Sequence, residues 1–118
     1  MNDAEILKDI PLIHEKITRC ERSVLDFERN IMHEQSSIAD LKVYMGMDKD
    51  RVKEGLRPRY DPVSMQENIT RHENNIQLFK EKIDGEYSTI KKFKDILAVL
   101  HNDLGKNPEQ VFMYPRGM

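Results

Sequence analysis

Histidine stands directly before glutamate at three places in the chain, His14-Glu15, His33-Glu34 and His72-Glu73. Imidazole and carboxylate groups are metal ligands, and helical bundles that hold metals take them from a Glu-x-x-His spacing on facing helices. Neighbouring residues point about 100° apart around a helix, so none of these dipeptides forms a chelating face. We therefore expect neither a metal site nor a cofactor.

The other residue types that support catalysis do not occur in catalytic patterns. Cys20 is the only cysteine, so we expect no intrachain disulfide, a reducing cytoplasmic compartment and a thiol that packs as a small hydrophobe. A run of acids from Asp48 fails as a calcium loop because its twelfth position is Arg59, where a carboxylate is needed. Gly-rich phosphate loops, serine-nucleophile motifs, CxxC and HExxH are missing from the sequence. We predict that the protein is not an enzyme.

The composition is typical of long helices surrounded by solvent. The 118 residues are 34% charged and 38% apolar, contain no Trp, and carry a net charge of −2. Such a balanced charge creates no overall field for nucleic acid or membranes. The N-terminal MNDAEILKDIPLI is too short and too charged for a signal peptide or a membrane span. We expect a single domain over residues 1–118, with no membrane contact.

The first arm of the chain repeats apolar residues at steps of three and four, which is the condition for a coiled coil. We predict a helix over 10–54, preceded by a short separate turn over 1–9. One set of heptad positions is Ile10, Ile17, Val24, Ile31, Ile38 and Met45, and the other is Ile13, Cys20, Phe27, Glu34 and Leu41.

The second arm repeats the pattern, and we predict a helix over 62–104. Asp61-Pro62 offers a cap and a first-turn proline, and the alternative start is a capping box at Ser64–Glu67. Gly105 supplies a helix stop, which leaves a tip loop over 55–61 and a tail over 105–118. The two sets are Ile69, Ile76, Ile83, Ile90, Leu97 and Leu104, and Met65, His72, Phe79, Glu86, Phe93 and Leu100.

The two arms are expected to fold against each other about Gly55 as an antiparallel coiled-coil hairpin. In that register Phe27 meets Ile83 and Glu34 meets Ile76. Apolar residues off the main stripe favour a dimeric four-helix bundle or a higher oligomer, so the chain is expected to bind itself. The predicted core is Ile17, Val24, Phe27, Ile31, Ile38, Phe79, Ile83, Ile90 and Phe93.

Three polar residues interrupt the apolar stripes: Glu34, Glu86 and His72. We interpret the two glutamates as residues that set register or partner choice, or that reach Arg or Lys at the edge of the stripe. A carboxylate metal pair is the competing interpretation. His72 is interpreted as a hydrogen-bonded histidine of the core.

Two segments outside the heptads are candidate contact sites. The basic tip comprises Lys49, Arg51, Lys53, Arg57, Arg59 and Tyr60. It is interpreted either as a contact for single-stranded nucleic acid or an acidic partner, or as an ordinary solvated loop. The tail contains an apolar run, which either docks on the protein's own bundle or inserts into a partner protein. That run is Val111, Phe112, Met113 and Tyr114.

The order of helix, glycine-bearing charged loop, helix and short tail is similar in layout to the small recombination mediators of large phages, and this likeness implies no site residue. Prefoldin-like subunits also have long helices at both ends, but they need strand-forming hairpins between them, which 46–61 does not provide. We predict a structural assembly or adaptor protein that contacts other proteins through its loop and tail. A component of a virion or another large assembly fits this description. The alternative is an accessory nucleic-acid-binding protein that uses the basic tip.

Overall fold

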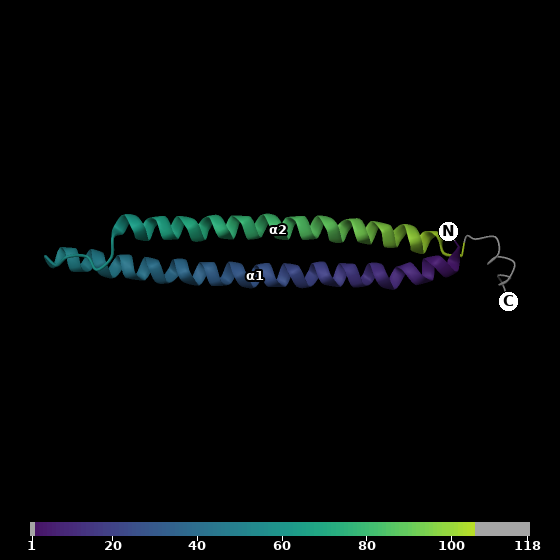
Figure 1. Cartoon of the computed structure of the whole chain (residues 1–118), viewed down its shortest axis with the longest axis horizontal. Coiled ribbons are helices and arrows are strands. Elements are labelled where there is room, and N and C mark those ends of the chain that lie inside the picture. The colour runs from purple at the N-terminus through teal and green to yellow at the C-terminus, as the bar shows by residue number, and fades with distance from the viewer. Residues whose placement is uncertain (1, 106–118) are drawn as a thin grey trace. The chain divides into compact units, whose positions relative to one another are not determined.

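The computed structural model describes residues 2–105, and this part of the chain is all-helical. It contains two long helices, α1 (Asp3–Lys53) and α2 (Pro62–Asp103), and no strand (Figure 1). The chain divides into two compact units, each of which takes a stretch of both helices. We call Met1–Ser23 with Asp84–Met118 the terminal unit and Val24–Ile83 the tip unit. Neither helix has an apolar stretch long enough to cross a membrane.

The first helix begins earlier than the sequence predicts. The Oδ1 atom of Asn2 accepts a hydrogen bond from the Glu5 N–H at 2.8 Å, so Asn2 is the N-cap. Residues 3–9 therefore form the first turns of α1 rather than a separate turn, and Pro11 lies inside the helix. A proline at that position removes one helical N–H. The cap and the acidic residues Asp3 and Glu5 in the first turn favour helix there.

The C-terminal end of α1 is closed by Gly55. This glycine has a φ of +81°, which places it in the left-handed region that favours glycine. The Leu56 N–H donates to the Arg51 carbonyl at 2.9 Å and the Gly55 N–H donates to the Val52 carbonyl at 3.0 Å. These are the two hydrogen bonds of a Schellman motif, which satisfies carbonyls at the helix end.

The second helix starts at the first of the two predicted positions. Asp61 accepts a hydrogen bond from the Val63 N–H at 3.3 Å through Oδ1 and one from the Ser64 hydroxyl at 2.8 Å through Oδ2. The Ser64 hydroxyl, and after it the Val63 N–H, hold the pKa of Asp61 below its usual range. Pro62 is the first helical residue. At the other end, Gly105 has a φ of +85° and follows the last turn of α2, as predicted for the helix stop.

The terminal unit is held by a small apolar core between the two helices. Ile17, Ile90 and Leu97 are buried there. The Asp3 side chain is also buried, and its Oδ1 accepts a hydrogen bond from the Gly105 N–H at 3.3 Å. The partly buried residues against this core are Ile10, Ile13, Cys20 and Phe93.

The tip unit buries fewer side chains completely. Val24, Met65 and Ile69 are buried. The Phe27 and Phe79 rings lie 6.1 Å apart between centroids, and the Lys82 Nζ lies 5.7 and 5.8 Å from those two centroids. An ammonium over aromatic faces is an attractive contact. The half-buried members of the predicted core in this unit are Phe27, Ile31, Ile38, Phe79 and Ile83.

The register in the tip unit differs from the predicted one by about one helical turn. Phe27 contacts Phe79 and Glu34 contacts His72, whereas the predicted register sets these two residues opposite Ile83 and Ile76. Both observed pairs are equidistant from residue 53 in the sequence, whereas the predicted pairs are equidistant from residue 55. Because both arms have the same three-four spacing, a shift of one turn keeps apolar residues facing each other, and contacts between specific side chains decide the register.

Candidate functional site

A polar cluster lies between α1 and α2 inside the tip unit. Glu34 from α1 contacts the His72 Nδ1 through Oε2 and accepts a hydrogen bond from the Asn75 Nδ2 through Oε1 at 3.4 Å. The Glu34 and His72 side chains are only 19% and 28% exposed. The partners of Glu34 are thus a histidine and an amide from the facing helix, and not the Arg or Lys of one of the two predicted alternatives. A charged contact at this depth favours the register in which its partners meet.

The second interrupting glutamate, Glu86, lies beside Cys20 in the terminal unit. Burial raises the pKa of the Cys20 thiol, and the hydrogen bond to Glu86 and the charge of its carboxylate raise it further. A raised pKa keeps the thiol protonated at neutral pH, where it is a poor nucleophile. The Cys20 site therefore resembles a packing position more than a reactive one.

Metal-ligating residues do not gather in the described part of the chain. Within residues 2–105, no group of three or more His, Cys, Asp or Glu side chains is placed to hold a metal ion. Glu34 and His72 together supply two donors, which already contact each other.

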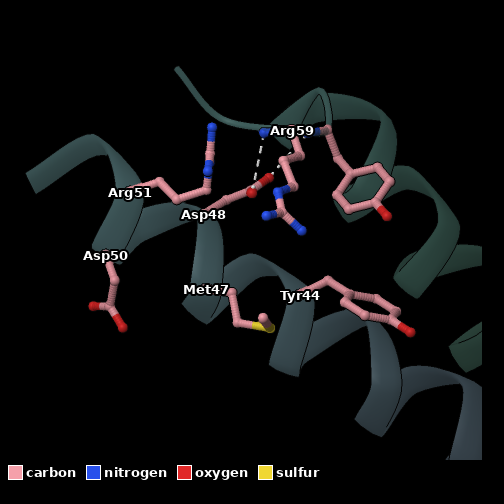
Figure 2. Close-up of a pocket in the computed structure, with 7 residues that line it drawn as sticks. Tyr44, Met47, Asp48, Asp50, Arg51 and Arg59 are labelled. Carbon is pink, nitrogen blue, oxygen red and sulfur yellow. Dashed lines mark hydrogen bonds between the residues drawn. The ribbon is translucent and has the colours of Figure 1, made fainter. Parts of the chain in front are cut away.

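The tip loop is tied to α1 by the carboxylate of Asp48. Its Oδ1 accepts a hydrogen bond from the Arg59 N–H at 3.1 Å, and its Oδ2 accepts one from the Tyr60 N–H at 3.0 Å (Figure 2). Asp48 is only 6% exposed. This role of Asp48 was not predicted, although the sequence contains a signal for it: Asp48 is the heptad position that follows Leu41 and therefore faces α2 or the loop.

Asp48 brings two aromatic rings and two arginines together around a hollow of about 300 Å³. The Tyr44 and Tyr60 rings lie 5.8 Å apart between centroids, tilted by 46°. Figure 2 shows the Arg59 side chain extending toward Tyr44, while the Asp50 carboxylate points away. The residues that line the hollow are Tyr44, Met47, Asp48, Asp50, Arg51, Arg59 and Tyr60.

The six residues of the predicted basic tip are thus divided between several places. Arg51, Arg59 and Tyr60 share this first hollow. Lys49 and Lys53 line a second hollow of about 270 Å³, whose other walls are largely apolar: Met45, Val52, Pro58, Pro62 and Met65. Arg57 lines neither hollow, and its carbonyl accepts a hydrogen bond from the Arg51 Nε at 3.1 Å.

Comparison of the chain with protein-family models, with curated proteins and with solved structures finds no match. The predicted docking tail, Val111, Phe112, Met113 and Tyr114, lies outside the described residues.

Proposed function

We propose that this chain is a non-enzymatic assembly or adaptor protein, which associates with itself through its helices and contacts partner proteins through its tip loop and tail. A component of a larger particle, such as a virion, fits this role. The proposal rests on the helical architecture together with the apolar surface that the helices leave exposed.

The exposed apolar surface is the observation that carries the proposal. In the described part of the chain, fifteen large hydrophobic side chains are exposed, in addition to the eight that are buried and others that are half-buried. Leu25, Met32 and Tyr87 are 54%, 65% and 52% exposed. Complete burial of one such side chain contributes about 1.5–3 kcal/mol. Association that covers several of them on each copy therefore yields a stable complex.

Self-association is tested by sedimentation equilibrium of the full chain over a wide range of protein concentrations. We expect a mass of at least twice 14.0 kDa, with dissociation only on strong dilution. A single species of monomer mass up to millimolar concentration would contradict the proposal.

A second function is supported by the hollow beside Asp48. Tyr44 and Tyr60 present aromatic faces that are 45% and 50% exposed, and Arg51 and Arg59 lie in the same hollow. Stacking on aromatic rings combined with phosphate contacts from basic side chains is how many proteins bind single strands. We propose contact with single-stranded nucleic acid at the tip as the alternative role of this surface.

This alternative is tested by fluorescence anisotropy with a labelled oligothymidine at low salt. We expect binding that weakens as salt rises and that falls at least tenfold when Arg51 and Arg59 become alanine. The matched control replaces Lys91 and Lys92 with alanine, because these exposed lysines on α2 carry the same charge away from the tip. Equal losses in both double variants would show non-specific attraction, and no binding at low salt would end the alternative.

A further inference from the structure

The outer face of α1 in the tip unit carries a second stripe at three-four spacing. The α1 positions on this outer stripe lie about 150° around the helix from those that face α2. All of its residues are exposed, and Leu25, Met32 and Val43 are more than half exposed. The outer stripe comprises Leu25, Met32, Ser36, Ala39, Val43 and Gly46, and Arg29 occupies the stripe position between Leu25 and Met32.

Gly46 is a glycine that the fold of this chain does not explain. It lies inside α1, its φ is not positive, and a Cβ added to it meets nothing within 4 Å. Glycine in a helix interior is destabilising relative to alanine. A glycine on an exposed helix face permits the close approach of a side chain from outside the chain.

From these observations we propose that a second copy of this chain packs antiparallel against the outer stripe, with the two-fold axis between Gln35 and Ser36. This inference rests on the self-association proposed above and specifies its surface. Antiparallel pairing about this axis sets Leu25 of one copy over Gly46 of the other and Met32 over Ala39. Leu25 and Met32 thus each meet a small residue, which is how well-packed helix pairs interdigitate.

The charges that flank the outer stripe match the same register. Glu28 of one copy faces Lys42 of the other, and both are exposed. The exposed His33 imidazole faces the Asp40 carboxylate, which can accept a hydrogen bond from it. The two-fold axis repeats each pair. A parallel pairing would instead place Glu28 against Glu28 and Lys42 against Lys42, and it would leave Gly46 opposite Gly46. The antiparallel arrangement is therefore favoured both by charge and by side-chain volume.

The exposed apolar residues of α2 in the tip unit do not form an equivalent surface. Val63 and Leu78 are 64% and 55% exposed, but they stand far apart along α2 with polar residues between them. The second copy is accordingly assigned to α1.

Disulfide crosslinking tests the register directly. In a Cys20→Ser background, proteins carrying Met32→Cys and Ala39→Cys are mixed, equilibrated and then oxidised. We expect a crosslinked dimer from the mixture and none from either protein alone, since in the proposed register position 32 lies about two turns from its own equivalent and a disulfide needs Cα atoms within about 7 Å. Crosslinking of Met32→Cys alone would show parallel association and overturn the proposal. A Thr70→Cys protein mixed with Met32→Cys is the control for random collision, because Thr70 is exposed on α2.

Charge exchange supplies an independent test that does not depend on new cysteines. Glu28→Lys places like charges together at both symmetric sites, and we expect dimerisation to weaken about tenfold. The double variant Glu28→Lys with Lys42→Glu restores opposite charges and should recover the dimer. A dimer in which neither the crosslink nor the rescue appears would refute this face while leaving self-association intact. A protein that is monomeric throughout would refute both.

Discussion

The contact between Glu34 and His72 offers the sharpest test of how this hairpin selects its register. Replacing Glu34 alone with leucine leaves His72 without its carboxylate and Asn75 without the acceptor that it contacts. Leaving a mostly buried polar group unsatisfied costs about 1–3 kcal/mol. Because about a fifth to a quarter of these side chains remains exposed, we expect a loss of about 1–2 kcal/mol in the free energy of unfolding.

Replacing both residues with leucine should have the opposite result. Both positions belong to the heptad sets that face across the helices, so the double variant exchanges a partly buried contact between a carboxylate and an imidazole for apolar packing. Such exchanges are often neutral or stabilising, by up to about 4 kcal/mol. We expect the double variant to be at least as stable as the natural protein and clearly more stable than either single variant.

The measurement is urea unfolding followed by circular dichroism at 222 nm, at one fixed protein concentration because association adds to apparent stability. The matched control is the same cycle on Glu15 and Arg19, an exposed ion pair at 2.9 Å on α1, for which we expect a coupling below about 0.5 kcal/mol. If the double leucine variant proves less stable than both single variants, the free-energy cost of removing Glu34 and His72 from water does not offset their contact. That result would refute the expected gain from apolar packing at these positions.

Three further outcomes follow from single positions. Asp48→Ala removes both hydrogen bonds that hold the tip loop, and should lower stability by about 2 kcal/mol and speed amide exchange in the loop, as measured by NMR. Gly55→Ala should lower the free energy of unfolding by about 1–2 kcal/mol, because φ at this position is +81°. Gly85→Ala should raise it by up to about 1 kcal/mol, because the space beside Gly85 is open. Equal effects of the two substitutions in urea titrations would contradict this expectation. The raised pKa of Cys20 means that the folded protein favours the protonated thiol. The contribution of this thiol to the free energy of unfolding is therefore fully present below the unfolded thiol pKa of about 8.5, and it is lost as pH rises through the higher folded pKa. Iodoacetamide should therefore react slowly with Cys20 at pH 8, and faster in a Glu86→Gln variant; an unchanged rate would refute the role of Glu86.

Local signals in the sequence predicted most of the secondary structure. Three-four spacing indicated both helices, Asp61-Pro62 marked the start of α2, and Gly105 marked its end. These features depend on neighbours within a few residues, so they can be recognised from one amino-acid sequence. The beginning of α1 was missed because its cap, Asn2, precedes a stretch in which Pro11 suggested a later start.

The candidate sites were predicted less well, because they depend on residues far apart in the sequence. The sequence predicts the basic tip as one group, but its members line two different hollows, and Arg57 takes part only through its backbone carbonyl. Tyr44 was not selected, since nothing near it in the sequence indicates that Tyr60 lies beside it.

The amino-acid sequence is sufficient to specify two heptad-patterned helices with a turn near Gly55, because helix period, caps and glycine stops are local properties. Only the tertiary structure decided which residues meet. A shift of one turn exchanges the two apolar sets of a heptad pattern and still leaves apolar residues facing each other. The register therefore depends on side chains that contact across the helices, such as Glu34 with His72 and Phe27 with Phe79. The role of Asp48 was decided in the same way, by the loop amides that its carboxylate reaches.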